Sequence, residues 1–325
     1  MKDFQFRIQT KKLINFFKKK QRTLLFFSFF FFLSVLVGAA ILDIFLRYYI
    51  FDKKTKDFPF EISQSLYPVL VSPIAPDISA KAAVVMDSDS KTILYSKNPN
   101  LLFSMASTTK IMTALVALEH FKMTDVLTIQ TEKVEGVNVG FKLGERLLFE
   151  DVLYAMLLPS GNDAALAVAQ NFPGGEDKFV EKMNEKAKDL KLIHTNFADS
   201  IGLIDSRDFT TPLELARLAS IAIKNETFKK IVATKTREIS DVAGNNTYLL
   251  ENLNKLLGVD GVNGIKTGFT DEAGQVLITS KIYKDENGNE HTLIIVVMGS
   301  LDRFWDTSKI LYSLSENVNY LSTRP

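Results

Sequence analysis

The sequence contains no cysteine, which excludes disulfide bonds and lipid attachment through a thiol. Its three histidines, His120, His194 and His291, are not spaced as metal ligands. No G-x-S-x-G motif accompanies them, so the sequence does not indicate a Ser-His-Asp hydrolase. A glycine-rich phosphate loop is also missing from the sequence. We therefore expect neither a metal nor a cofactor.

Charge is nearly balanced over the 325 residues, with a net charge of +1, but it is unevenly distributed. Residues 1–22 contain eight Lys or Arg and one Asp. A basic end of this kind can bind nucleic acid. The segment that follows it indicates a membrane instead, so we expect no nucleic-acid partner. The whole composition, 46% hydrophobic and 24% charged, is that of a globular protein.

A long apolar run follows the basic end. Residues 23–42 carry no charge, and about twenty such residues span the hydrocarbon core of a bilayer. Because four Lys or Arg lie between residues 18 and 22, the positive-inside rule leaves the N-terminus in the cytoplasm. We expect a cytoplasmic tail over 1–22 and a single transmembrane anchor over 23–51, with the rest of the chain on the extracytoplasmic side of the cytoplasmic membrane.

A cleaved signal peptide is the alternative, because the segment "VGAA" at 37–40 has small residues of the type found at cleavage sites. The apolar region of a signal peptide usually has about 7–15 residues, so the length of this run favours an uncleaved anchor. The sequence does not decide whether the N-terminal segment is cleaved.

Residues 52–79 are expected to form a linker, since they are first charged and then contain four prolines without sustained periodicity. A folded domain is expected over 80–325. Two short β-prone runs open it, and the turn signal Asn287-Gly288 separates two more near its end. The segments between are helical in pattern, and Asp302 is placed to cap a last helix. The expected strands are 80–87, 91–97, 275–283 and 291–300, and the expected helices include 107–121, 150–158, 163–170 and 211–224.

The stretch "ASTTKIMTA" at 106–114 opens one of these helices, with Ser107 and Thr108 as candidate N-caps. Lys110 stands where a capping box would have an acidic residue. Residues i and i+3 share a helix face, so its amine is expected beside Ser107. Burial and the positive end of the helix both lower a lysine pKa, which would let Lys110 act as the base for a serine nucleophile.

Two further motifs follow in the chain. Ser160, Gly161 and Asn162 lie at a junction between two expected helices, and "KTG" at 266–268 lies just before an expected strand. Taken alone, the four-residue pattern S-x-x-K occurs by chance in many proteins, the S-G-N segment would be an ordinary loop, and Lys266 would be a solvated lysine at a strand edge. Together and in this order they match the signature of penicillin-binding proteins and class A β-lactamases, with S-G-N as the middle member.

From about Ala80 to Val318 the chain resembles the low-molecular-mass penicillin-binding proteins, the serine-type D-alanyl-D-alanine carboxypeptidases of bacterial cell-wall metabolism. The segments "LLPSGNDAALAVA" and "GVNGIKTGFTDEAGQVL" carry this resemblance together with the S-x-x-K helix. Met105 stands where a proline is usual, and "FADSIGL" replaces a segment that often reads like "NPHGL". The resemblance implies a mixed α/β, β-lactamase/transpeptidase-like fold, in which an antiparallel sheet is covered by helices and a mostly helical lobe is inserted.

The resemblance also implies catalytic roles. Ser107 would attack the carbonyl between two terminal D-alanines and form an acyl-enzyme, with Lys110 as base. Ser160 would relay a proton to the leaving amine. Asn162 would orient Lys110 and hold an amide of the substrate.

Substrate binding is implied for the strand that follows. Lys266 and Thr267 would bind the terminal carboxylate of the substrate, and Gly268 would let it approach the strand backbone closely. The backbone N–H groups of Ser107 and Phe269 would form the oxyanion hole. The expected partners are peptidoglycan stem peptides, β-lactam antibiotics as covalent inhibitors, and membrane lipid around the N-terminal helix.

Three other functions use the same motifs. A class A β-lactamase needs a glutamate for deacylation, and no E-x-x-L-N segment lies between "SGN" and "KTG" to supply it. A D,D-endopeptidase that cuts peptidoglycan crosslinks would use the same machinery, so it stays open. A catalytically idle penicillin-recognising protein is disfavoured by the intact motifs.

Overall fold

The computed structural model describes residues 2–47, 66–203 and 206–322, with side chains from residue 18 onward. The chain divides into two compact units, 1–63 and 64–325. Each unit is described by itself.

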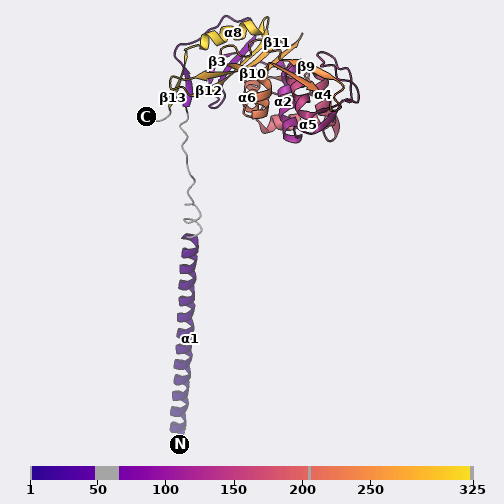
Figure 1. The fold of residues 1–325 in the computed structure, drawn as a ribbon. Helices are drawn as coiled ribbons and strands as arrows, with labels where there is room; N and C mark the ends of the chain where they lie inside the picture. Colours follow the sequence, from indigo (N-terminus) through magenta and orange to yellow (C-terminus); the bar gives the residue numbers. More distant parts are fainter. Residues whose placement is uncertain (1, 48–65, 204–205, 323–325) are drawn as a thin grey trace. The chain divides into compact units, whose positions relative to one another are not determined.

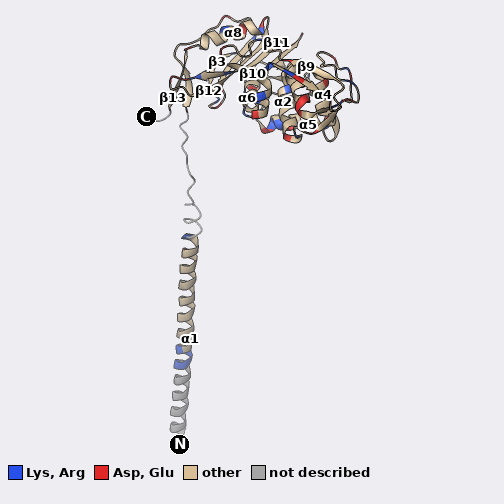
Figure 2. Ribbon diagram, in the orientation of Figure 1, with Lys and Arg blue, Asp and Glu red and all other residues tan. Residues whose placement is uncertain are grey.

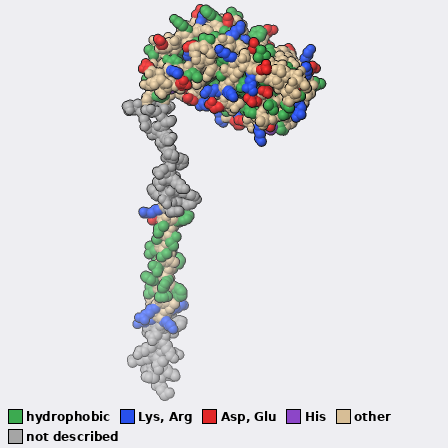
Figure 3. Space-filling view, in the orientation of Figure 1, with side chains coloured by type: hydrophobic (Ala, Val, Ile, Leu, Met, Phe, Trp, Pro, Cys, Tyr) green, Lys and Arg blue, Asp and Glu red, His purple; other side chains and the backbone are tan. Residues whose placement is uncertain are grey.

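The first unit contains one long helix, α1 (Lys2–Arg47). Its described Lys and Arg residues at 18–22 lie ahead of a run of uncharged residues and Arg47 lies after that run (Figure 2), and the side chains of the run are mostly hydrophobic (Figure 3). Over Lys18–Arg47 the helix is long and apolar enough to cross a membrane, by length and composition. The predicted apolar span 23–42 lies within it, whereas residues 48–51 of the predicted anchor and 52–65 of the predicted linker lie outside the described residues.

The second unit is built on a five-stranded antiparallel sheet with the strand order β10-β11-β12-β2-β3 (Figure 1). The N-terminal hairpin lies against the C-terminal strands, because β2 pairs with β12 in the register Val84↔Val296. The predicted strands near both ends of the domain are therefore confirmed as parts of one sheet. The strands are β2 (Ala82–Asp87), β3 (Ile93–Lys97), β10 (Val262–Thr270), β11 (Gly274–Lys284) and β12 (Glu290–Ser300).

Both faces of this sheet are buried. Successive side chains of a strand point to opposite faces, and β12 accordingly sends Leu293, Ile295 and Val297 into one hydrophobic core and its alternate residues into another. Helix α8 (Arg303–Leu314) packs on the first face through its buried apolar side chains. As predicted, Asp302 caps this helix by accepting hydrogen bonds from the backbone N–H groups of its first turn.

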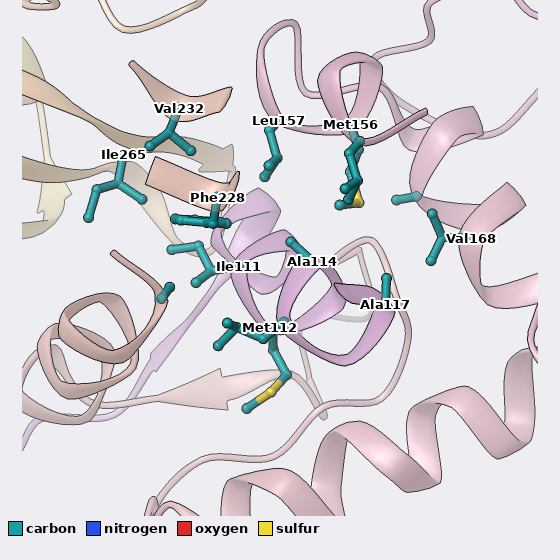
Figure 4. Close-up of a cluster of buried hydrophobic side chains, with 14 of the residues drawn as sticks. Ile111, Met112, Ala114, Ala117, Met156, Leu157, Val168, Phe228, Val232 and Ile265 are labelled. Atoms are coloured by element: carbon teal, nitrogen blue, oxygen red, sulfur yellow. The ribbon is translucent and has the colours of Figure 1, made fainter. Parts of the chain in front are cut away.

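The other face carries the helical lobe. Helix α2 (Lys110–His120) lies at its centre, and Figure 4 shows Ile111, Met112, Ala114 and Ala117 surrounded by apolar side chains of other elements. This all-round burial agrees with the nearly continuous apolar sequence of the helix. The remaining helices of the lobe are α3 (Phe149–Leu157), α4 (Asn162–Asn171), α5 (Gly175–Asp189), α6 (Pro212–Ala222) and α7 (Glu226–Val232).

Short antiparallel pairs complete the second unit. They are β4 (Phe103–Ser104) with β7 (Phe209–Thr210), β5 (Val126–Thr128) with β6 (Arg146–Leu148), and β8 (Thr236–Ser240) with β9 (Thr247–Glu251).

The end of the expected linker differs from the prediction. Strand β1 (Leu66–Leu70) pairs with β13 (Val318–Ser322), although Pro68 lies within it. Proline is tolerated there because this pair has only two strands, so each has a free edge. Ile78 is also buried in the core under α8. The compact unit thus starts well before residue 80.

Candidate active site

Ser107 lies on a tight turn rather than in the first turn of a regular helix. A 3₁₀ helix over Ala106–Thr109 precedes α2, and Ala106 has a φ of +47°. Neither helix start has a side-chain cap, so the expectation that Ser107 or Thr108 is an N-cap was wrong. The Thr108 hydroxyl instead donates to the carbonyl of Met105 at 2.6 Å, across the turn. The Ser107 hydroxyl therefore caps neither helix start.

Lys110 is the first residue of α2 and is fully buried. Its Nζ atom donates to Ser107 Oγ at 3.1 Å, to Asn162 Oδ1 at 2.7 Å and to the carbonyl of Ile201 at 2.9 Å. Burial lowers the pKa of Lys110 from 10.5 to about 7, against the charges of Asp199 and Asp163, which act in the opposite direction. Near neutral pH a large fraction of this amine is therefore neutral and within reach of the serine proton.

The S-G-N segment lies at the junction of α3 and α4, as predicted. Asn162 is the first residue of α4. Its side-chain Nδ2 donates to the carbonyl of Glu135 at 2.5 Å, and its Oδ1 accepts a hydrogen bond from Lys110. The hydroxyl of Ser160 is buried and has no hydrogen-bond partner among the described residues. Its backbone has a φ of +69°, so the segment is held in an uncommon conformation.

The loop 199–203 supplies a contact that the sequence reasoning missed. The carboxylate of Asp199 accepts hydrogen bonds from the backbone N–H groups of Ile201, Gly202 and Leu203, which fixes the loop and aims the Ile201 carbonyl at Lys110. At Gly202 (φ +85°) a Cβ atom would lie 2.0 Å from the Ala106 carbonyl oxygen. The only signal for this loop in the sequence was "FADSIGL", which was noted as a departure from the family pattern.

The K-T-G segment lies on β10, which packs against the turn that carries Ser107. A Cβ atom at Gly268 would lie 3.2 Å from the Met105 carbonyl oxygen and 3.3 Å from Ala106 Cβ. In this structure Gly268 therefore allows the strand to approach the nucleophile turn, a role different from the predicted close approach of substrate. Phe269 follows with 59% of its surface exposed.

Lys266 is buried beside these residues, and its Nζ atom donates to the carbonyl of Thr267 at 3.1 Å. Burial, and after it the charges of Lys110 and Arg303, hold the pKa of Lys266 well below its usual range. Arg303 was not predicted as a site residue. Its guanidinium donates to the carbonyl of Gly268 at 2.8 Å, from the start of α8. The Arg303 guanidinium thus brings a positive charge to the end of β10, and no carboxylate of the described residues is bound to Lys266.

A serine hydroxyl bonded to a buried, partly neutral lysine, between an antiparallel sheet and a helical lobe, defines the class of serine acyl-transfer enzymes with a penicillin-binding, transpeptidase-like fold. The family model of D-alanyl-D-alanine carboxypeptidases matches residues 70–301. The chain belongs to this family of serine peptidases.

Individual relatives agree with this assignment. The D-alanyl-D-alanine carboxypeptidase DacF of Bacillus subtilis is 33% identical over 228 residues, which are 67% of this chain and 57% of that protein. The D-alanyl-D-alanine endopeptidase of Escherichia coli is 32% identical over 246 residues, 72% of this chain and 77% of that one. The crystal structure of the Streptomyces K15 DD-transpeptidase superposes with a TM-score of 0.68 at 31% identity, covering 74% of this chain and 98% of that one.

Proposed function

We propose that this protein is a serine D,D-peptidase that removes the terminal D-alanine from peptidoglycan stem peptides. The observation that carries the proposal is the fully buried Lys110 amine, with a pKa of about 7 and a distance of 3.1 Å to Ser107 Oγ. A weak nucleophile is activated when such a base takes its proton.

The reaction has two halves. Lys110 accepts the Ser107 proton while Oγ bonds to the carbonyl carbon between the two D-alanines, and the C–N bond then breaks. The leaving amine receives a proton, relayed through Ser160, whose buried hydroxyl is free of other partners among the described residues. Water next attacks the ester carbonyl, which releases the shortened peptide and restores the Ser107 hydroxyl.

The substrate carboxylate is assigned to Lys266 and Thr267. An anion placed beside Lys266 raises the pKa of its amine again, so binding and protonation support each other. The backbone N–H groups of Ser107 and Phe269 are assigned to the developing oxyanion, and the second hydrogen of Asn162 Nδ2 to a substrate amide. β-Lactams would acylate Ser107 in the same way.

A D,D-endopeptidase is the second candidate, because relatives with that name from Pseudomonas aeruginosa and Escherichia coli match 77% and 72% of this chain. Cleavage of a crosslink needs the same acylation at Ser107, with an amine of a second stem peptide as leaving group.

The location proposed for this activity is the outer side of the cytoplasmic membrane. Helix α1 is long and apolar enough over Lys18–Arg47 to serve as a single-pass anchor. Protease added to intact spheroplasts should then digest the second unit and spare the basic residues at 18–22. Protection of the second unit would contradict this topology.

The main test is incubation of the detergent-solubilised full-length protein with a stem pentapeptide ending in D-Ala-D-Ala, with products identified by mass. We expect free D-alanine and a tetrapeptide from the wild type and none from Ser107→Ala. Pentapeptide that stays intact with folded wild-type protein would refute the proposal.

A further inference from the structure

A pocket that the proposed reaction does not use lies beside α8, the yellow helix of Figure 1, and has a volume of about 540 Å³. Helix α8 packs on the face of the sheet whose core contains Ile295 and Val297. Met105 and Ala106, just before the nucleophile, belong to the core on the other face. The sheet therefore lies between this helix and the turn that carries Ser107.

Two exposed aromatic side chains line the pocket. Trp305, the only tryptophan in the sequence, is 61% exposed, and Tyr312 is 84% exposed. They are seven residues apart and so share one face of α8, distinct from the face that buries Ile310 and Leu314. Large exposed apolar surfaces of this kind mark sites of interaction.

The charged groups of the lining balance each other. Lys309 lies one helical turn after Trp305, with its Nζ atom 5.5 Å from the centre of the indole ring. The same Nζ atom lies 3.7 Å from a carboxylate oxygen of Asp77, whose side chain is fully exposed. Ser308 and Ser313 also line the pocket. A cation paired with a carboxylate favours neither an anionic nor a cationic ligand, but both groups can hydrogen-bond to hydroxyls.

We infer that this pocket, lined by Asp77, Trp305, Lys309 and Tyr312, binds the glycan strand of peptidoglycan. The choice of this polymer rests on the proposed function, because the stem peptides of that reaction are attached to it. A pyranose ring has an apolar face of C–H groups, which stacks on an aromatic ring. Its rim carries uncharged hydroxyl and acetamido groups, which hydrogen-bond to polar side chains. An aromatic pocket with a few polar groups of balanced charge is complementary to both parts.

The same lining disfavours a membrane as the occupant. Tryptophan, tyrosine and lysine are common at membrane interfaces. However, the anionic surface of a bilayer repels an exposed carboxylate such as that of Asp77. A concave pocket also suits a ring-shaped ligand better than a flat surface of lipid.

A glycan bound beside α8 would hold the substrate polymer near the enzyme. Binding at one site raises the effective concentration of the attached peptides at the other. Soluble peptides without sugars gain nothing from the pocket. The inference therefore predicts a difference between glycan-linked and free pentapeptides.

The direct test is the fluorescence emission of Trp305, which reports on this pocket because the chain has one tryptophan. Detergent-solubilised full-length protein is titrated with the tetrasaccharide of N-acetylglucosamine, an uncharged glycan without peptide. The wild type should show a saturable change in emission. Tyr312→Ala should raise the Kd about two- to twelvefold, the size of one aromatic contact, and Tyr312→Phe should keep the wild-type Kd.

The matched control is Leu249→Ala, which removes an exposed apolar side chain of β9 outside the pocket and should leave the Kd unchanged. A second measurement uses the reaction. Release of D-alanine from a soluble pentapeptide should be equal in wild type and Tyr312→Ala. Release from pentapeptides attached to glycan strands, below saturation, should fall in Tyr312→Ala by the same factor as the affinity.

Each outcome supports or overturns the glycan site. Saturable binding that weakens in Tyr312→Ala and not in Leu249→Ala supports it. Emission that does not respond to the tetrasaccharide overturns it, as does an equal loss in the control or an unchanged rate on the glycan-linked substrate. Quenching of Trp305 by brominated acyl chains in reconstituted vesicles assigns the pocket to lipid, and emission that changes only with protein concentration assigns it to a second copy; both overturn it.

The glycan site and the proposed function can fail separately. Protein that releases D-alanine from the soluble pentapeptide but does not bind the tetrasaccharide has the peptidase function without the glycan site. Folded protein that binds the tetrasaccharide but leaves the pentapeptide intact has the glycan site, and the proposed peptidase function is then refuted.

Discussion

Replacing Asn162 by aspartate is a sharp test of the proposed base. Asn162 Oδ1 lies 2.7 Å from Lys110 Nζ, so Asn162→Asp places a carboxylate oxygen against the amine with little change in shape. An opposite charge this close raises a lysine pKa by about 1–3 units. From the value of about 7 in the wild type, the pKa of Lys110 should rise to about 8–10.

The rate of acylation should follow the neutral fraction of Lys110. In the wild type it should rise about tenfold per pH unit below pH 7 and level off above, because half of the amine is neutral near that pH. In Asn162→Asp the neutral fraction at pH 7 falls to between about a tenth and a thousandth, so acylation should slow by about fivefold to 500-fold. Most of the loss should be recovered at high pH.

The measurement is the second-order rate of labelling by a fluorescent penicillin as a function of pH, since it isolates acylation. Asn171→Asp is the matched control. It lies at the other end of α4, and its Nδ2 atom donates to the carbonyls of Thr128 and Ala167, each at 2.8 Å, so the same exchange also removes a donor there. That control should keep the wild-type inflection. An inflection that stays in place in Asn162→Asp would show that Lys110 is not the base.

Three further outcomes follow from the same geometry. Ser107→Ala should abolish labelling by penicillin yet cost less than about 1 kcal/mol in thermal unfolding, because Ser107 caps no helix; stoichiometric labelling would rule out this nucleophile. Gly202→Ala should destabilise by about 2–4 kcal/mol in denaturant unfolding, since its Cβ would clash with the Ala106 carbonyl, and wild-type stability would contradict that. Lys266→Gln should lower the preference for a D-Ala-D-Ala peptide acid over its amide by about tenfold or more, measured as the ratio of kcat/KM values, whereas an unchanged ratio would remove Lys266 from carboxylate recognition.

Much of the fold could be predicted because local pattern and tertiary environment agree. The spacing of apolar residues predicts both the buried helix α2 and the strand β12, whose successive side chains enter two different hydrophobic cores. The pairing of β1 with β13 could not be read in this way. Its two strands are about 250 residues apart, the first contains Pro68, and neither has a strong periodicity, so only the assembled fold brings them together.

In the candidate site, side-chain chemistry was predictable and backbone chemistry was not. The spacing of Ser107 and Lys110 predicted their contact, which the hydrogen bond confirms. The Ile201 carbonyl has no signature, because every residue has a carbonyl and only loop geometry selects the one that meets an amine. Gly268 shows the same limit of sequence-based prediction. The sequence shows that this position has no side chain, but only the packing of β10 on the 3₁₀ turn shows which neighbour lies close to its backbone.

The burial that lowers the pKa of Lys110, and so lets it act as a base, also lowers the free energy of unfolding. Its pKa is 10.5 ordinarily and about 7 when folded, so between these values the unfolded chain binds more protons and stability rises with pH. Below pH 7 both states are protonated and the full cost applies, about 5 kcal/mol from a shift of this size. A carboxylate bonded to Lys110 would raise the pKa of the amine again. That would remove the cost to stability, but it would also keep Lys110 protonated and unable to act as the base. Among the described residues, Lys110 instead donates only to neutral oxygens, of Ser107, Asn162 and Ile201. The Asp199 carboxylate accepts hydrogen bonds from backbone N–H groups of the loop and so aims the Ile201 carbonyl at Lys110.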